Sequence, residues 1–400
     1  NTMIIRIGYI PVLTCLAWAC VCCNSQQMAL PDPAETLAIM ERVNDHWQSE
    51  HPIQPITHWQ PYADSSPFWH NAAYHTGNLA AWLVTHHDRW LDYSRSWAEG
   101  AQWMGATSCD TAAWRYDYGE KPESVLFGDW QICFQSYAEL WQIDRQLGIA
   151  DDDSIQQVKL ARARGVMEYE MNTDRNDYWW WADGLYMVMP VMVRLGNITG
   201  NPQYGEKLYE YWSYAKGLMY DQEEHLFYRD GKYLFPNHQT AAGKKDFWAR
   251  GDGWVLASLA RCLDELPQTY AHRQELLQTY REMAAAVSAC QQPDGYWTRS
   301  MLDPEQAPGP ETSGTAFFCY GLLWGIRNDV LSRQDYLPVC LKAWDYLTHT
   351  ALQEDGSLGY VQPIGERAIP GQTVDQNSTA PFGVGAFLLA AKEMYLLSQR

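Results

Sequence analysis

The tetrapeptide Asp294-Gly295-Tyr296-Trp297 ends one helical stretch and belongs to a pattern that recurs along the chain. Asp-Gly pairs also stand at Asp230-Gly231 and Asp355-Gly356, each after a helical pattern and before aromatic residues. The pairs are 64 residues apart (230 to 294) and 61 residues apart (294 to 355). Asp-Gly is typical of tight turns, because glycine adopts a positive φ without steric cost. A period of about sixty residues predicts repeated helical hairpins with long connections.

Helical periodicity dominates the rest of the sequence, and strand patterns are scarce. Six hairpins of about sixty residues account for most of the chain. Closed into a ring they form an all-α fold, the (α/α)6 barrel, while an open superhelix with the same period is the alternative. Since no Gly-, Pro- or Ser-rich linker divides residues 28–400, we expect one domain there, with the site in the loops at one mouth of the ring. The spacing predicts helices at Ala34–Ser49, Trp69–His86, Arg89–Met104, Phe127–Leu147, Asp152–Met171, Ala182–Leu195, Pro202–Met219, Phe247–Leu266, His272–Gln291, Thr312–Ile326, Arg333–Thr350 and Asn377–Ser398.

The composition excludes some classes of function. The 400 residues include 48 acidic and 29 basic side chains, a net charge of −19. Nucleic acid is therefore not an expected partner, because binding it requires a basic face. A small anionic substrate is compatible with this charge, since a few local Arg or Lys residues suffice to bind one carboxylate. The 20 Trp and 25 Tyr residues suit a deep core, a sugar-stacking cleft, or both.

Residues 1–27 form a separate segment. Arg6 supplies a positive charge, residues 7–23 are almost wholly apolar, and polar residues end the run. This pattern predicts an export signal and is a little short for a membrane-spanning helix. Ala17-Trp18-Ala19-Cys20 has some likeness to a lipoprotein cleavage site, so a lipid anchor is an alternative route to a membrane. We expect an exported protein of the periplasm or cell surface, and nothing in the sequence indicates an oligomeric state.

No metal and no cofactor are predicted. The histidines lack metal-ligand spacing, and no cysteines form a CxxC pair after the leader. A phosphate-binding loop and a Gly-x-Ser-x-Gly motif are both missing, which excludes nucleotide-dependent and serine-hydrolase chemistry. An exported chain allows a disulfide, but most cysteines of the body lie in apolar helical stretches, where buried free thiols are expected. These cysteines are Cys109, Cys133, Cys262, Cys290, Cys319 and Cys340.

Two aspartates open predicted helices among aromatic residues. Asp183 follows the run Trp179-Trp180-Trp181, where partial desolvation would raise its pKa and suit it to general acid catalysis. Asp129 lies in Phe127-Gly128-Asp129-Trp130, 54 residues earlier. At equivalent starts of successive inner helices, the two would face each other across the ring as a carboxylate pair of the kind that sugar hydrolysis uses. The structural alternative for each is a helix cap.

Two further clusters carry polar groups at predicted helix starts. In Trp248-Ala249-Arg250-Gly251-Asp252-Gly253-Trp254, Arg250 between two indoles would hold a carboxylate while the rings stack on a sugar. The alternative for Arg250 is a structural ion pair. Lys244-Lys245 adds positive charge just upstream. In Glu311-Thr312-Ser313-Gly314, Thr312 or Ser313 is expected to cap a helix.

These clusters resemble glycoside hydrolase family 105, the unsaturated rhamnogalacturonyl and glucuronyl hydrolases, and more distantly family 88. The likeness runs from about residue 60 to about residue 395. Asp252 departs from it, since the family usually has Asn there, and Asp129 stands alone where many relatives have two adjacent aspartates. The matching pieces are Trp180-Trp181-Ala182-Asp183, Trp248–Trp254, Glu311–Ala316 with Tyr320-Gly321, and Trp69-His70-Asn71 through Tyr74 and Gly77.

The resemblance implies an (α/α)6 barrel and a particular reaction. Polysaccharide lyases leave a C4=C5 double bond in a terminal uronic acid, and enzymes of this family hydrate that vinyl ether. Asp183, carried over from the family's Trp-x-Asp motif, would protonate C4 and then help to deprotonate the water that adds at C5. The resulting hemiacetal opens and releases the next sugar without a covalent intermediate. The expected substrate is an unsaturated oligosaccharide from pectin rhamnogalacturonan or from ulvan.

The resemblance also implies roles for other residues. Asp129 would hold ring hydroxyls or tune Asp183, and Arg250 or Lys245 would face the uronate carboxylate. Two alternatives stay open: an inverting glycosidase acting on a saturated substrate, and a glycan-binding protein without turnover. The residues expected to shape the sugar subsite are Tyr74, Trp181, Met187, Trp248 and Trp254.

Overall fold

The computed structural model describes residues 29–56, 60–116, 118–149 and 153–400, with only the backbone described at 153–156. The predicted export signal lies outside the described residues. Within them the chain forms twelve α-helices and no β-strand longer than an isolated bridge. The all-α prediction is confirmed, and the observed helices match the predicted ones in number and order.

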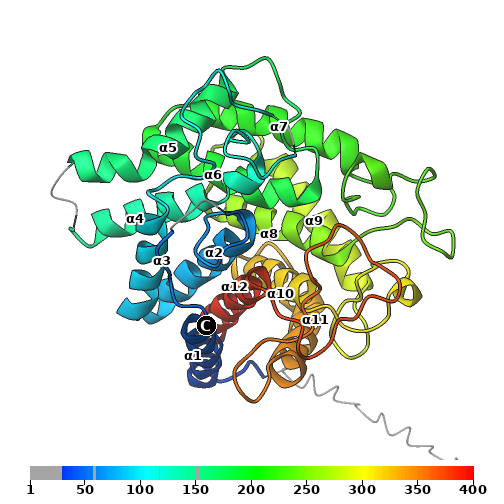
Figure 1. The fold of residues 1–400 in the computed structure, drawn as a ribbon. Coiled ribbons are helices and arrows are strands. Elements are labelled where there is room, and N and C mark those ends of the chain that lie inside the picture. The colour runs from blue at the N-terminus through cyan, green and yellow to red at the C-terminus, as the bar shows by residue number, and fades with distance from the viewer. Residues whose placement is uncertain (1–28, 57–59, 117, 150–152) are drawn as a thin grey trace, which may run out of the picture.

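Six helices form an inner ring and six cover it from outside (Figure 1). Each inner helix contacts the next, and α12 contacts α2, which closes the ring. The closed (α/α)6 barrel is confirmed over the open superhelix. The inner helices are α2 (Trp69–Thr85), α4 (Cys133–Gln146), α6 (Ala182–Thr199), α8 (Ala249–Glu265), α10 (Thr312–Arg327) and α12 (Pro381–Ser398). The outer helices are α1 (Pro33–Glu50), α3 (Asp88–Gly100), α5 (Asp153–Met171), α7 (Gln203–Met219), α9 (Arg273–Ala289) and α11 (Arg333–Tyr346).

Glycine allows the ring to close. A Cβ placed on Gly77 of α2 would lie 2.2 Å from the carbonyl oxygen of Gly385 of α12. A Cβ on Gly385 would lie 2.5 Å from the carbonyl oxygen of Ala73. Both distances are too short for any side chain. The first and last inner helices therefore pack backbone to backbone because neither carries a side chain at this crossing.

Burial separates the two layers of helices. In α10 every residue from Thr312 to Ile326 is buried, as expected for a helix surrounded by others. In α9 only one stripe is buried, with its members three or four residues apart: Arg273, Leu276, Thr279, Tyr280, Met283, Ala284 and Val287. The core also takes up much of the tryptophan content. Fully buried tryptophans are Trp90, Trp97, Trp130, Trp179, Trp181, Trp212, Trp248, Trp254, Trp297 and Trp324.

Two of the three Asp-Gly pairs occupy equivalent turns. Gly295 and Gly356 both have a positive φ (92° and 96°), and each donates its N–H to the carbonyl three residues earlier. These turns follow α9 and α11. The equivalent turn after α7 is at Asp221–His225, where the His225 N–H donates to the Asp221 carbonyl. The Asp230-Gly231 pair instead starts the short 3-10 helix η2 (Gly231–Tyr233), so its place in the sixty-residue period is coincidental.

Several helix boundaries differ from the predicted ones. The segment predicted as one helix from Phe127 contains the 3-10 turn η1 (Gly128–Trp130) and then α4, so Asp129 precedes the α-helix. The α11 helix ends in a π-helical turn, η4 (Leu347–Ala351). A third 3-10 turn is η3 (Pro304–Gln306). Among the described residues, no helix is both long enough and apolar enough to span a membrane. The six described cysteines are free, and four of them are buried, as expected.

Candidate active site

The inner helices begin at one end of the ring, which we call the mouth. There Trp69 of α2 stacks on Phe382 of α12, with 5.2 Å between ring centroids. The Arg250 guanidinium of α8 lies 4.7 Å from the Phe382 ring and donates to Ser313 Oγ of α10 at 3.3 Å. Because each helix N-terminus carries a partial positive charge, the mouth favours anionic groups.

Trp181 brings the two predicted aspartates together. Its indole is 1% exposed and stands between Gly128 and Gly184, since a Cβ on either glycine would lie 3.0 Å from the ring. Asp129 follows the first glycine in η1, and Asp183 precedes the second in α6. The ring thus acts as a spacer between η1 and the start of α6. Since α4 and α6 are neighbours, the aspartates lie beside each other rather than across the ring.

Asp129 and Asp183 are each only 8% exposed, and both bind a proton more tightly than an ordinary Asp. Burial, and then the charge of Asp183, raises the pKa of Asp129 well above its usual value, while Arg229 opposes the shift. Burial also raises the pKa of Asp183, again against the opposing charge of Arg229. Two like charges in one desolvated site resist joint ionisation, so the pair holds a proton to higher pH. Such a pair can supply a general acid.

Arg229 is the basic residue of this site that the sequence did not reveal. Its Nε lies 3.2 Å from Asp183 Oδ1, its Nη1 lies 2.7 Å from Asp230 Oδ2, and the residue is 7% exposed. It follows α7 and reaches α6 through a long-range pairing. The Ala182 N–H donates to the Arg229 carbonyl at 2.8 Å, and Trp181 forms a bridge with Asp230. The one available signal was its place beside the first Asp-Gly pair.

Arg250 lies at the mouth, where both of its terminal nitrogens bond to the protein itself, while its Nε has no partner among the described residues. The residue is 1% exposed, its Nη1 donates to the Gln362 carbonyl at 2.6 Å, and its Nη2 donates to the Pro363 carbonyl at 2.8 Å. Glu311 lies 3.9 Å away, and the Trp248 ring lies 4.6 Å away. Burial lowers the pKa of Arg250 to about 10, against the charge of Glu311, so the group stays protonated near neutral pH. Arg250 clamps the segment between α11 and α12 onto α8.

Lys245 is paired elsewhere. Its Nζ lies 2.9 Å from Asp221 Oδ2, 2.8 Å from Glu223 and 3.7 Å from Glu224. In the described part of the chain, no ion pair links it to Asp183. The structure therefore does not bring Lys245 into the carboxyl pair.

Three other predicted residues form the wall beneath the mouth. Trp248 is 2% exposed, and its Nε1 donates to Gln362 Oε1 at 2.8 Å. Trp254 is fully buried, with its ring centroid 4.5 Å from that of Phe317. Met187 lies one helical turn after Asp183 and is 1% exposed. These side chains support the site, whereas only Trp181 directly spaces the aspartates.

Tyr74 lines a cavity of about 290 Å³ together with Tyr62 and His70. Its hydroxyl donates to Asn44 Oδ1 at 2.6 Å. Burial, and then the hydrogen bond and charge of Glu120, raise the pKa of Tyr62.

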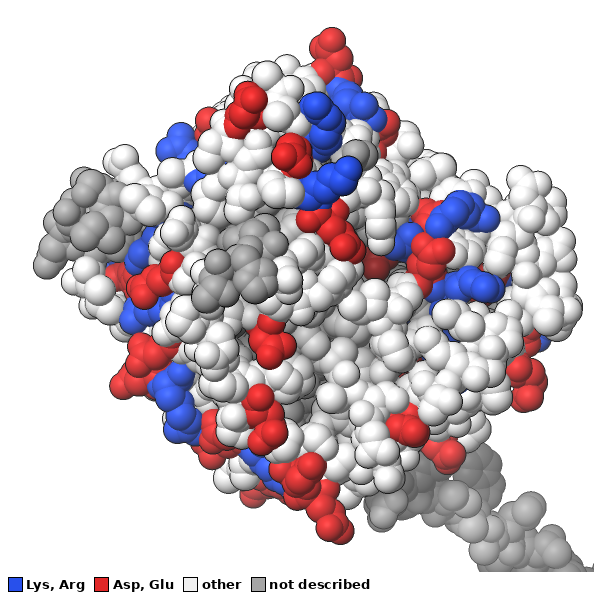
Figure 2. All heavy atoms as spheres, in the orientation of Figure 1, with Lys and Arg blue, Asp and Glu red and all other residues white. Residues whose placement is uncertain are grey.

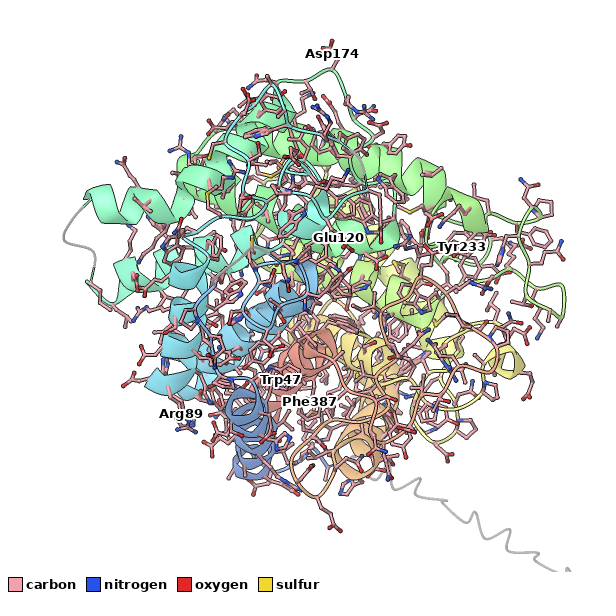
Figure 3. All side chains as sticks on the ribbon, in the orientation of Figure 1. Trp47, Arg89, Glu120, Asp174, Tyr233 and Phe387 are labelled. Carbon is pink, nitrogen blue, oxygen red and sulfur yellow. The ribbon has the colours of Figure 1, made fainter. Side chains whose placement is uncertain are left out.

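Two exposed tyrosines, Tyr62 and Tyr118, lie on the same side of the molecule as the carboxyl pair and feel its charge. Tyr118 is 65% exposed, and its ring centroid lies 6.3 Å from that of Trp180. The Tyr62 hydroxyl donates to Glu120 Oε1 at 2.7 Å, and Figure 3 labels Glu120 near the middle of this face. Exposed rings beside a buried acid are what stacking on a sugar requires. Tyr62, Tyr118 and Glu120 were not among the residues predicted from the sequence.

The cap of α10 differs from the prediction. Glu311, not Thr312 or Ser313, is the N-cap, and its carboxylate accepts from the N–H groups of Ser313 (3.1 Å) and Gly314 (2.6 Å). It also accepts from the Gln362 N–H at 2.9 Å. The Glu311 cap therefore helps Arg250 to hold the segment between α11 and α12.

Comparisons with known proteins agree on one family. The model of Glycosyl Hydrolase Family 88 matches residues 34–398. An unsaturated 3S-rhamnoglycuronyl hydrolase of Formosa agariphila is 31% identical over 324 residues, covering 76% of this chain and 85% of the relative. A solved glycosyl hydrolase family 88 structure from Bacteroides vulgatus is 53% identical, with a TM-score of 0.84 over 91% of this chain and 99% of that one. A structure named a polysaccharide lyase is 57% identical, with a TM-score of 0.83 over 91% and 97% of the two chains.

Proposed function

The chain belongs to glycosyl hydrolase family 88, and we propose that it removes a 4,5-unsaturated uronic acid from the non-reducing end of oligosaccharides made by polysaccharide lyases. It is a glycosidase of the unsaturated uronyl hydrolase class, as the resemblance implied. The observation that carries the proposed chemistry is the Asp183 carboxyl, buried beside Asp129 and within 3.2 Å of the Arg229 guanidinium.

In the proposed reaction, Asp183 gives its proton to C4 of the C4=C5 double bond. Positive charge develops at C5 and the ring oxygen, and the carboxylate that forms on Asp183 stabilises it. Water then adds at C5 while the Asp183 carboxylate takes one of its protons, so the acid is regenerated. The product at C5 is a hemiketal. Its ring opens to a ketone, which leaves a hemiacetal at C1 that collapses and releases the next sugar with its hydroxyl.

The site supports this order of steps. The acid must be protonated when substrate binds, and burial raises the pKa of Asp183 against the opposing charge of Arg229. Asp129 has no hydrogen-bond partner among the described residues, so its oxygens are free to bind a sugar hydroxyl. We propose that Trp180 and Tyr118 contact the sugar, with Trp181, Trp248, Trp254 and Met187 holding the wall behind them.

A matched pair of substrates tests the reaction. The two disaccharides are identical except that one ends in the unsaturated uronate and the other in its saturated counterpart. We expect turnover of the unsaturated compound only. Equal cleavage of both would favour an inverting glycosidase, and binding without turnover of either would favour a glycan-binding protein.

The polysaccharide lyase name of the 57% identical structure favours a second candidate, β-elimination. That reaction creates the C4=C5 double bond that the proposed hydration consumes. Ultraviolet absorbance of the conjugated uronate therefore falls during hydration and rises during elimination. We expect absorbance to fall on unsaturated oligosaccharides and to stay constant on the intact polymer.

We propose that the second sugar of the substrate is rhamnose, because the relative from Formosa agariphila is named a rhamnoglycuronyl hydrolase. Pectin rhamnogalacturonan and ulvan both supply such units. Turnover of lyase products from these polymers, compared with those from glycosaminoglycans, tests this assignment. Faster turnover of glycosaminoglycan products would contradict it.

We also propose that the protein is exported, by the leader at residues 1–27. Cell fractionation of a host that expresses the full chain tests the proposal. Recovery of an uncleaved chain in the cytoplasm would contradict it, and radiolabelled fatty acid at Cys20 would identify the lipid-anchored form.

A further inference from the structure

Glu366 is a fourth acidic side chain near Arg229, besides Asp129, Asp183 and Asp230. It lies in the long segment between α11 and α12, which Arg250 holds to the mouth at Gln362 and Pro363. Its Oε2 lies 3.1 Å from Arg229 Nη1. The same guanidinium therefore binds the proposed acid through Nε and Glu366 through Nη1.

Three donors converge on the Glu366 carboxylate from the segment after α7. Besides Arg229, Lys232 Nζ lies 3.0 Å from Oε1 and 2.9 Å from Oε2, and the Tyr233 hydroxyl donates to Oε1 at 2.6 Å. A guanidinium, an ammonium and a phenol around two oxygens form a complete carboxylate-binding set. In the region where Figure 3 labels Tyr233, Figure 2 shows basic and acidic side chains side by side at the surface.

This carboxylate is accessible, unlike the structural ones. The Glu366 side chain is 40% exposed and that of Lys232 is 61% exposed, whereas Glu311 is fully buried. Because it is exposed, the side chain of Glu366 can leave its donors toward solvent while Arg250 keeps the base of the segment in place.

The substrate carries a carboxylate at a matching place. In a 4,5-unsaturated uronate the carboxyl carbon is bonded to C5, which is bonded to C4. An acid that reaches C4 must therefore lie a few ångströms from that carboxylate. Arg229 holds Asp183 and Glu366 at that spacing, one on each of two nitrogens of a single guanidinium.

We propose that Arg229, Lys232 and Tyr233 form the subsite for the uronate carboxylate, and that Glu366 occupies this subsite until the substrate displaces it. The proposal rests on the proposed function for the identity of the sugar. It replaces Arg250 and Lys245 as the residues that face the carboxylate. Both terminal nitrogens of the buried Arg250 side chain donate to backbone carbonyls, and Lys245 is paired with acidic side chains.

The test measures binding of an unsaturated disaccharide by calorimetry in an Asp183→Asn background, so that turnover does not interfere. Adding Glu366→Gln keeps the shape but removes the competing charge, and we expect the Kd to fall about 3- to 10-fold as the competing state is lost. Adding Lys232→Met removes a donor, and we expect the Kd to rise about tenfold. Glu354→Gln is the control, since Glu354 is exposed in the same segment. It should leave the Kd unchanged.

A second ligand, in which the uronate carboxylate is esterified, tests whether this carboxylate is the group that the subsite binds. With the uronate methyl ester, we expect weak binding that neither Glu366→Gln nor Lys232→Met alters. If both effects persist with the ester, the cluster binds another oxyanion of the oligosaccharide and the assignment is overturned. An unchanged or higher Kd for Glu366→Gln with the free acid would also overturn it. Because binding is measured, these outcomes stay distinct from a failure of the proposed hydrolysis.

Discussion

At the level of single residues, the pKa of Asp183 depends on its burial and on one neighbouring charge. Asp183 lies beside the buried Trp181 indole, and Arg229 supplies the opposing charge, while the charge of Asp183 in turn raises the pKa of Asp129. Burial outweighs the guanidinium, so the pKa of Asp183 is raised. A carboxyl tuned in this way is protonated at a pH where an exposed Asp is not.

Replacing Asp183 with Asn removes the transferable proton while keeping the shape of the side chain. We expect the rate of absorbance loss on an unsaturated disaccharide to fall about 10²- to 10⁴-fold, as for other general acids. Circular dichroism should show an unchanged helix content. Asp174→Asn is the control, because Asp174 is exposed and far from the middle of this face (Figure 3). Full activity of Asp183→Asn would show that another group donates the proton.

Replacing Asp129 with Asn tests the electrostatic coupling of the pair. Since activity requires a proton on Asp183, kcat/KM should decline as pH rises through the raised pKa. Because two neighbouring carboxyls resist joint ionisation, removal of one of them lets the remaining carboxyl lose its proton at lower pH. We expect the alkaline limb of the pH profile to move to lower pH. If the alkaline limb of the pH profile does not move, the charges of the two carboxyl groups do not affect each other's pKa.

The sequence singled out Asp183, the proposed acid, but not its cationic partner Arg229, and the reason is physical. Asp183 lies at a helix start beside aromatic residues, which is a local pattern. Arg229 reaches the site only because its backbone pairs with Ala182, a contact between segments 47 residues apart (182 to 229). No local pattern encodes such a pairing. Glu366 is further away still and was not predicted for the same reason.

At the level of helices and turns, the start of α6 depends on the absence of two side chains. Gly184 is the third residue of α6, where Ala would be favoured by helix propensity by about 1 kcal/mol. Its Cβ, however, would lie 3.0 to 3.1 Å from three atoms of the buried Trp181 ring. The indole cannot move away, because Gly128 packs against it from the other side.

We therefore expect Gly184→Ala to lower the free energy of unfolding by about 1–3 kcal/mol, the usual range for overpacking, and to reduce activity by displacing Asp183. Thermal or urea unfolding and the absorbance assay measure the two effects. Gly217→Ala in α7 is a matched control, because its Cβ would meet nothing within 4 Å. That control should be neutral or stabilising. Equal behaviour of the two variants would disprove the spacer role of Trp181.

Glu170 makes the stability of α5 dependent on pH. Burial raises its pKa to about 8, with a partly opposing hydrogen bond from Gln131. The pKa of Glu170 in the folded state lies above its value in the unfolded chain, near 4.5. The stability that the protonated Glu170 contributes is therefore complete below pH 4.5 and is lost as pH rises through 8. The loss follows from proton binding, since the folded chain holds this proton more tightly than the unfolded chain does.

Glu170→Gln keeps the hydrogen bond and removes the charge. We expect the variant to be more stable than the original protein above pH 8, with the difference shrinking toward pH 4.5. Urea unfolding at a series of pH values measures it. Glu99→Gln, at an exposed position of α3, should show no such trend. A pH-independent difference for Glu170→Gln would contradict the raised pKa.

The positions of the helices were the part of the structure that the sequence predicted best. Apolar spacing located all twelve, because each buries a stripe or a whole surface. The turns were predicted less well. Asp230-Gly231 has the residues of a turn, yet the bridge between Trp181 and Asp230 places it beside α6. The predicted N-cap of α10, Thr312 or Ser313, was wrong. The longer Glu311 side chain accepts from the two backbone N–H groups that these residues were expected to satisfy.

At the level of the whole molecule, ring closure assembles the site from remote segments. The group around Asp183 draws on η1, α6, the segment after α7 and the segment before α12. The contact between α12 and α2 through Gly77 and Gly385 completes the ring that holds these segments at one mouth. The sequence period predicted the ring, but only the folded chain shows which side chains meet there.

The most direct test is to follow the reaction of an unsaturated disaccharide in D₂O and to locate deuterium in the released uronate by NMR. Protonation of the alkene predicts one deuterium at C4, incorporated as the absorbance of the double bond disappears. Release of the second sugar with the C4=C5 bond intact, or a product without deuterium at C4, would contradict the role assigned to Asp183.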